Sequence, residues 1–119
     1  MTKYDRSPLE PLPLVRALLL ASIWHNPDST GYDLMGIVSE FTDKRVELKS
    51  GTIYAELRAL EKEGLAQSVR EKTGRRRRSY RVTGEGRENL IQLAEEVRFR
   101  TEHILSPLLS RVNSLKKHD

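Results

Sequence analysis

The chain has 119 residues, of which 21 are Lys or Arg and 17 are Asp or Glu, and it contains no Cys. This length fits one domain, and a charged fraction of 32% leaves room for only a modest core. No apolar run approaches the roughly 20 residues that a membrane span needs, and the first residues lack the basic-then-apolar order of a signal peptide. The absence of Cys excludes disulfides, thiolate zinc sites and Cys nucleophiles. We therefore expect a cytoplasmic protein that does not enter a membrane.

The net charge is distributed unevenly along the chain. Residues 1–49 carry a net charge of −1, residues 50–83 carry +5 and residues 84–119 carry zero, so the middle segment supplies the whole excess of +4. A local basic field raises the local concentration of polyanions, and nucleic acid is the commonest of these. Charge alone is equally compatible with an ordinary solvated surface. The interpretation therefore depends on the elements that carry this charge.

Two helices are predicted before the basic segment. Apolar side chains cover most of the circumference of residues 12–25, which is typical of a helix buried on several sides, and we expect this helix to be central. Trp24 lies within it and is expected to pack in the core in preference to stacking on a ligand. A second helix is predicted over residues 30–42, because Thr30 and Asp33 have the form of a capping box.

The third predicted helix, residues 50–63, has an unusual outer face. Ser50 is a good N-cap residue, and apolar residues recur at a spacing of three and four, so one face is expected to be buried. Small residues, hydroxyls and cations occupy the opposite face, which allows close approach to another surface. This outer face consists of Gly51, Thr52, Tyr54, Ala55, Arg58 and Lys62.

A β-hairpin with a basic tip is predicted next. Residues 65–72 and 78–83 have strand-like composition with partial alternation, and Thr73 and Gly74 mark a turn between them. Tyr80 on the returning strand is expected to face the core. Four consecutive arginines lie at or just past the tip and repel one another in the absence of a polyanion, so we interpret them as phosphate or minor-groove contacts. They are Arg75, Arg76, Arg77 and Arg78.

One long helical pattern runs from Thr83, its predicted cap, to Lys117. A helix of this length spans about 50 Å, which exceeds the size of a domain with a radius of gyration of about 14 Å. Its apolar seam therefore needs a second partner, and a copy of the same chain is the simplest one. Pro107 is expected to kink the helix near Ile104 or to split it. The predicted dimerisation residues are Leu90, Ala94, Val97, Thr101, Ile104 and Leu108.

This order of elements predicts a mainly α fold with a small β-hairpin, namely a winged helix-turn-helix with a long C-terminal dimerisation helix. A helix fits the major groove, which is about 12 Å wide, and a wing reaches an adjacent groove or the backbone. The expected domains are an N-terminal extension (1–11), a DNA-binding domain (12–83) and the dimerisation helix (84–119).

Three segments resemble the PadR-like family of transcriptional regulators: TGYDL (30–34), SGTIYAELRALEKEGL (50–65) and RRRRSYRVTGEGRENL (75–90). The resemblance covers residues 14–90 in the correct order and implies a homodimeric repressor that binds a palindromic operator. It also implies phosphate or base contacts for Ser50, Thr52 and Tyr54. Thr30 and Ala55 stand where many members have His and Pro, respectively. The bases that this chain prefers are therefore not inferred from those of its relatives.

Several site residues have a second interpretation. The free N–H groups at a helix N-terminus attract an anion, but Ser50 can serve only as a cap. Tyr54 can pack its ring and offer only its hydroxyl. Arg58 is the candidate for a base edge, most plausibly guanine, and Lys62 for a phosphate. Both cations can alternatively pair within the helix, with Glu61 or Glu63 as acid.

The remaining function classes have little support in the sequence. No clustered His, Asp and Glu set or Gly-rich phosphate loop indicates an enzyme, and His25, His103 and His118 are too scattered for a metal site. No cofactor is expected, and nothing indicates an effector. The expected partners are double-stranded DNA and a second copy of the chain. Two rivals remain: a module that docks on an acidic protein, and a nucleoid-type binder without sequence preference.

Overall fold

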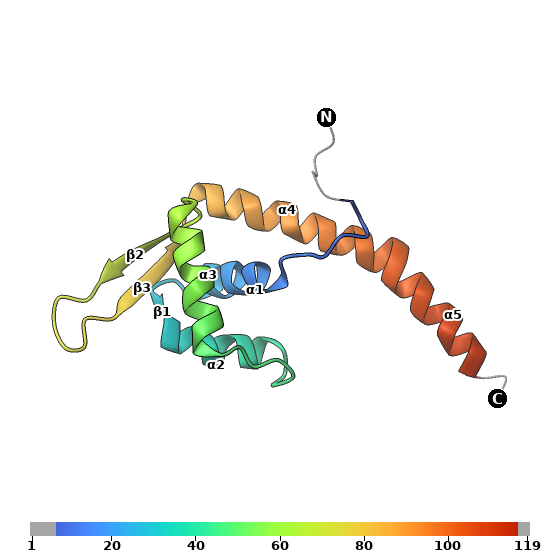
Figure 1. Cartoon of the computed structure of the whole chain (residues 1–119), viewed down its shortest axis with the longest axis horizontal. Coiled ribbons are helices and arrows are strands. Elements are labelled where there is room, and N and C mark those ends of the chain that lie inside the picture. Colours follow the sequence, from blue (N-terminus) through green and yellow to red (C-terminus); the bar gives the residue numbers. More distant parts are fainter. Residues whose placement is uncertain (1–6, 117–119) are drawn as a thin grey trace. The chain divides into compact units, whose positions relative to one another are not determined.

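The computed structural model describes residues 7–116. Its contacts divide the chain into two compact units, one formed by residues 13–90 and one by the described residues on either side of that range. Helices dominate, and short strands lie between them (Figure 1). The elements are α1 (Leu14–His25), β1 (Ser29–Thr30), α2 (Gly31–Phe41), α3 (Ser50–Lys62), β2 (Ala66–Arg70), β3 (Arg78–Val82), α4 (Gly84–Arg100), the π-helical turn η1 (Thr101–Leu105) and α5 (Ser106–Lys116).

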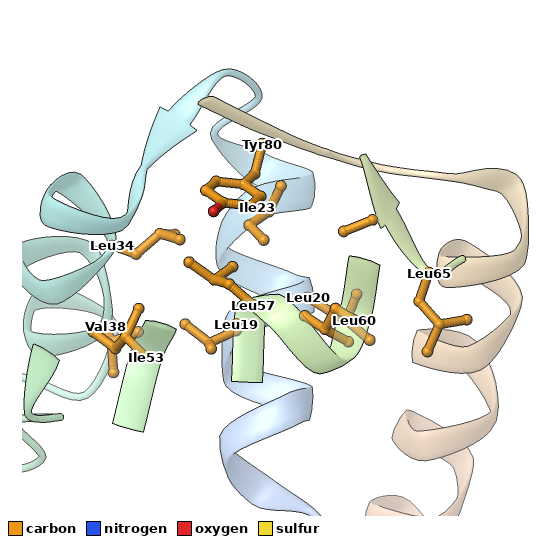
Figure 2. Packing of buried hydrophobic residues seen from close by; sticks show 11 residues of the cluster. Leu19, Leu20, Ile23, Leu34, Val38, Ile53, Leu57, Leu60, Leu65 and Tyr80 are labelled. Atoms are coloured by element: carbon orange, nitrogen blue, oxygen red, sulfur yellow. The ribbon is translucent and has the colours of Figure 1, made fainter. Parts of the chain in front are cut away.

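A single apolar core holds the unit of residues 13–90 together. Helices α1, α2 and α3 contact one another, and their inward side chains converge with residues from the sheet (Figure 2). Burial of each large aliphatic side chain contributes about 1.5–3 kcal/mol. The core residues are Leu19, Leu20, Ile23, Leu34, Val38, Ile53, Leu57, Leu60, Leu65, Ala66 and Tyr80.

The first helix is less enclosed than its composition predicts. Leu14 is 57% exposed and Trp24 is 46% exposed, so the expectation that Trp24 packs in the core is wrong. The reason is geometric. At about 100° per residue, Leu14 lies half a turn away from the buried Ile23, and Trp24 lies on its flank.

The starts of α2 and α3 are built differently. Thr30 Oγ1 accepts a hydrogen bond from the Asp33 N–H at 3.0 Å, and Asp33 Oδ2 accepts one from the Thr30 N–H at 3.0 Å, which confirms the predicted capping box. In α3, however, the hydrogen-bond ladder begins at the Lys49 carbonyl, which accepts from the Ile53 N–H at 3.1 Å. Lys49 is therefore the N-cap residue and Ser50 the first helical residue, so the prediction of Ser50 as the cap is wrong.

The wing belongs to a three-stranded antiparallel sheet of order β1-β3-β2. The predicted hairpin is present, and β1, which the sequence analysis missed, pairs with the other edge of β3. Two residues are too few to produce an alternating pattern. Alternation along β3 turns Tyr80 inward, as predicted, and leaves Arg81 exposed. Arg81 instead binds Asp28 through two hydrogen bonds, of 2.7 and 2.8 Å.

The start of α4 is fixed against the end of α3. Thr83 Oγ1 accepts from the Gly86 N–H at 3.0 Å, which confirms Thr83 as the cap, and it donates to the Gly64 carbonyl at 2.7 Å. A Cβ atom on Gly86 would lie 1.9 Å from the Leu65 carbonyl oxygen. This close approach requires glycine at position 86.

The C-terminal segment is helical from residue 84 to residue 116 but is not α-helical throughout. In η1 the Ser106 N–H donates to the Thr101 carbonyl, five residues earlier. Pro107 follows immediately, and its ring would clash with the carbonyl four residues before it in a regular α-helix. The predicted disturbance near Ile104 therefore takes the form of a π-helical turn. Within residues 7–116, no helix combines the length and apolar character needed to cross a membrane.

The π-helical turn changes which side chains share a face. A π turn holds one more residue than an α turn, so the side chains that follow it are rotated by about 100° relative to an unbroken α-helix. With this rotation Leu105 and Leu109 continue the line of Val97 and Thr101, and Leu108 falls to one side. The predicted dimer seam assumed a continuous α-helix.

Candidate nucleic-acid interface

The outer face of α3 is open to solvent. Its three apolar positions, Ile53, Leu57 and Leu60, are fully buried, and the face opposite them is exposed as predicted. The exposed face includes Ser50, Gly51, Thr52, Tyr54, Ala55, Arg58 and Lys62.

A cleft of about 670 Å³ lies between α3, the start of α2 and the β2–β3 hairpin. Five guanidinium groups, one from α3 and four from the hairpin, line this one cavity, so the cationic helix and the wing lie on a common side of the unit. In Figure 1 the hairpin loop projects beyond the helices. The lining residues are Thr30, Gly31, Tyr32, Tyr54, Arg58, Arg70, Arg75, Arg77, Arg78 and Tyr80.

The cleft brings together five of the nine predicted DNA-binding residues, namely Tyr54, Arg58, Arg75, Arg77 and Arg78. The other four lie outside its lining. Ser50, Thr52 and Lys62 are exposed elsewhere on α3, and Arg76 is exposed in the wing loop.

Tyr54 packs closely against the start of α2. A Cβ atom on Gly31 would lie 2.4–2.8 Å from Cε1, Cζ and Oη of Tyr54. The ring therefore fills the space that a side chain at position 31 would occupy, while Tyr54 stays 41% exposed. This arrangement fits the interpretation in which Tyr54 packs its ring.

The acidic residues of α3 are engaged elsewhere. Arg16 on α1 binds Glu56 at 2.8 Å and Glu63 at 2.6 Å, and Glu61 accepts a hydrogen bond from Ser68 at 2.7 Å. Hydrogen bonding to Arg16 lowers the pKa of the Glu63 carboxyl. Among residues 7–116, no ion pair joins Glu61 or Glu63 to Arg58 or Lys62, although the nearby charge of Lys62 also lowers the Glu63 pKa.

The wing loop has a defined backbone. Gly74 and Arg76 have positive φ values of 69° and 53°, and the Glu71 N–H donates to the Arg77 carbonyl at 2.8 Å where the loop closes. At the end of the ladder Arg70 stands directly opposite Arg78. Like charges at opposed positions of a sheet repel, so an anion in the cleft would relieve this repulsion.

Two residues of the cleft were missed by the sequence analysis. Tyr32 is 69% exposed, and the Arg77 Cζ atom lies 5.8 Å from the centre of its ring, which is within range of a cation–π contact. Arg70 joins the cleft from β2. Strand alternation could have placed Arg70 on one face with Ser68, but its position opposite Arg78 depends on a pairing register that the sequence does not reveal.

Among residues 7–116, no group of three His, Asp or Glu side chains is arranged to hold a metal ion.

Three packed helices with a projecting antiparallel hairpin define a winged helix-turn-helix protein. The sequence profile of the transcriptional regulator PadR-like family matches residues 19–92, and the chain belongs to this family. The family consists of transcriptional regulators, which agrees with the prediction that the chain is not an enzyme. No curated protein matches the sequence.

Solved structures agree with this fold. A transcriptional regulator from Clostridium thermocellum is 29% identical, with a TM-score of 0.71 over 77% of this chain and 87% of that one. A PadR family regulator from Clostridium difficile is 26% identical, with a TM-score of 0.64 over 79% and 97% of the two chains. Bacillus subtilis PadR in complex with operator DNA is 23% identical, with a TM-score of 0.59, and the match covers 67% of this chain but 46% of that one.

Proposed function

We propose that the chain is a homodimeric repressor that binds a palindromic operator through α3 and the arginine-rich wing. The observation that carries this proposal is the cleft in which five guanidinium groups from α3 and the hairpin meet. The five positive charges of this cluster favour a polyanion. The operator complex of the B. subtilis relative supports duplex DNA as that polyanion.

Helix α3 reads the major groove in this proposal. Ser50, Thr52 and Tyr54 lie in its first turns, where free N–H groups and the helix dipole favour a phosphate. Arg58 extends from the middle of the exposed face to a base edge, with guanine as the expected base, and Lys62 reaches a phosphate. The acids of α3 are engaged by Arg16 and Ser68, so the charges of Arg58 and Lys62 remain available to DNA.

The wing contacts the backbone beside that groove. Arg75, Arg76, Arg77 and Arg78 supply guanidinium forks that fit phosphate oxygens or a narrow minor groove. Arg70 and Tyr32 extend the same surface. Repression then follows from occupation of a promoter, and the proposed site of action is the cytoplasm.

The C-terminal helices pair two subunits and set the distance between two half-sites. Apolar side chains are exposed along this segment, including Val97, Leu105 and Leu109, and burial of such a row against a second copy stabilises a dimer. The proposed contacts are Leu90, Ala94, Val97 and Thr101 before the phase change at η1, and Leu105 and Leu109 after it, in place of the Ile104 and Leu108 expected for a continuous α-helix. The proposed domains are an N-terminal extension (1–11), a DNA-binding domain (12–83) and a dimerisation segment (84–119), of which residues 1–6 and 117–119 lie outside the described part of the chain.

A salt titration of DNA binding tests the proposal. Genomic fragments that the protein selects supply the cognate site, and affinity is measured for that site and for random duplex between about 50 and 200 mM salt. We expect affinity to fall steeply with salt on both, with a preference of about 10³-fold or more for the cognate site. Equal affinity for all duplexes would indicate a nucleoid-type binder, and no affinity for any duplex would favour docking on an acidic protein.

A further inference from the structure

Ser68 on β2 lies between an acid of α3 and an arginine of the wing. Its Oγ donates to Glu61 Oε2 at 2.7 Å and accepts from an Arg78 Nη1–H at 3.0 Å. We propose that this Glu61–Ser68–Arg78 relay fixes the wing relative to α3, so that Ser68 and Arg78 are positioning residues for DNA recognition. The inference rests on the proposed DNA-binding function.

The relay has a defined direction. A serine hydroxyl carries one proton, which goes to the carboxylate of Glu61, and its lone pairs then face the guanidinium of Arg78. Hydrogen bonds with an ionised partner are about twice as strong as neutral ones, and two in series polarise each other. The side chain of Ser68 therefore joins two formal charges that belong to different elements.

The sheet register explains why these three residues meet. Ser68 is paired with Tyr80 across the β2–β3 ladder, and Arg78 lies two residues before Tyr80 on β3. Side chains two residues apart on a strand share a face, so Ser68, Tyr80 and Arg78 all lie on one face of the hairpin. Tyr80 is part of the core to which α3 contributes, and this same face therefore adjoins α3.

The charges of Glu61 and Arg78 both act on the buried Tyr80. Burial raises the pKa of the Tyr80 hydroxyl, the negative charge of Glu61 raises it further, and the positive charge of Arg78 opposes these effects. Both charged groups thus lie near the same ring. This proximity agrees with the relay geometry.

The relay also explains how an acidic residue, Glu61, is accommodated beside the cationic residues of α3. Glu61 stands next to Lys62 and one turn from Arg58 on α3, where a free carboxylate would repel phosphate. Bound to Ser68, and through it to Arg78, its charge is compensated within the protein. Arg78 accordingly differs from Arg75, Arg76 and Arg77, because its guanidinium is already engaged before DNA arrives.

The test compares three single variants of the full chain. Ser68→Ala removes both hydrogen bonds of the relay, and Ser68→Thr keeps a hydroxyl. Ser79→Ala is the matched control, because Ser79 belongs to the same hairpin and its hydroxyl contacts only the Val69 carbonyl, at 3.4 Å, among the described residues. The measurements are affinity for the cognate site and for random duplex, the thermal midpoint, and backbone ¹⁵N relaxation of residues 73–77.

We expect Ser68→Ala to lose about three- to tenfold in affinity for the cognate site, the size of effect expected from one hydrogen bond, and less on random duplex. Its thermal midpoint should match that of Ser79→Ala, and residues 73–77 should become more mobile. Ser68→Thr and Ser79→Ala should retain wild-type affinity within about twofold. In an Arg78→Ala background, Ser68→Ala should have no further effect on affinity, because the relay is already broken.

Two results would overturn the relay. One is wild-type affinity and wild-type mobility of residues 73–77 in Ser68→Ala, and the other is full additivity of Ser68→Ala with Arg78→Ala. Failure of the wild-type protein to bind any duplex would instead contradict the proposed function. The relaxation measurement needs no DNA, so it decides the structural role of the relay in that case as well.

Discussion

At the scale of single residues, hydrogen-bonded side chains and one glycine determine how the sheet meets the helices. Arg81 and Asp28 join β3 to the segment before β1. Thr83 ties the start of α4 to Gly64, and Gly86 allows the backbone to approach Leu65. Substitution of Gly86 or of Arg81 removes one of these contacts at a time, and the two substitutions predict different measurable results.

Gly86→Ala should destabilise the fold by about 2 kcal/mol or more. The added methyl group would overlap the Leu65 carbonyl, and overpacking of this kind typically costs 1–3 kcal/mol. Gly84→Ala is the matched control, since a Cβ atom there meets nothing within 4 Å. Denaturant unfolding monitored by circular dichroism gives both free energies. Equal stability of the two variants would show that the start of α4 can move away from Leu65.

The Arg81–Asp28 pair should make stability depend on pH in the acid range. Hydrogen bonding to Arg81 lowers the pKa of the Asp28 carboxyl in the folded state. The stabilisation is therefore present above the unfolded pKa and is lost as the pH falls through the folded pKa. Arg81→Ala should have a lower thermal midpoint than wild type near neutral pH, and the gap should close in strong acid. A gap that is independent of pH would show that the pair does not contribute through its charges.

Arg58→Ala should affect sequence preference. A bidentate contact to a base contributes about 1–3 kcal/mol of discrimination, so we expect a loss of this size on the cognate site and relaxed preference at one position. Lys62→Ala, on the same face of α3, should weaken binding to all duplexes uniformly. Binding assays on the cognate site and its single-base variants separate the two effects. An equal loss of affinity for cognate and random DNA would show that Arg58 contacts a phosphate and not a base.

At the scale of elements, the wing and α3 line one cleft. Alanine at Arg75, Arg76 and Arg77 should weaken binding to every duplex and reduce the slope of log affinity against log salt by up to about three contacts, each worth about 0.9. Addition of Arg78→Ala should reduce the slope further and lower cognate affinity more than random-duplex affinity, because Arg78 is proposed both to contact phosphate and to hold the wing through Ser68. Arg98→Ala, an exposed arginine on α4, is the control. An unchanged slope in the triple variant would show that the wing does not contact the DNA backbone.

The elements that could be predicted from the sequence are those determined by local signals. The capping box of Thr30 and Asp33, the buried face of α3 and the inward side of Tyr80 each depend on residues a few positions apart. The pairing of β1 with β3, the closeness of Tyr54 to Gly31 and the binding of Arg16 to two acids of α3 depend on segments that are far apart in the chain. Five of the ten cleft-lining residues were predicted as DNA contacts, whereas the placement of Tyr32 and Arg70 beside them depends on contacts of this long-range kind.

At the scale of the whole molecule, the proposed dimer depends on the C-terminal helix. Leu109→Glu should convert the dimer to a monomer, because it places a charge in an apolar contact where the seam passes η1. Arg111→Glu changes an exposed position on the opposite side of α5 from Leu109, about 200° round the helix, and should leave the dimer intact. Sedimentation equilibrium measures both. A dimeric Leu109→Glu variant with the wild-type association constant would show that this row does not join the subunits.

The turn between Thr101 and Leu105 holds the two ends of this helix in a set rotational phase. Deletion of one residue from it, together with Pro107→Ala to remove the ring clash, would restore a plain α-helix and rotate everything beyond it by about 100°. Two subunits joined through the distal end would then meet at another angle, and their α3 helices would no longer match the spacing of the original operator. The one extra residue in this turn, which lies far from α3 in the sequence, would thus determine which pairs of half-sites the proposed dimer can span.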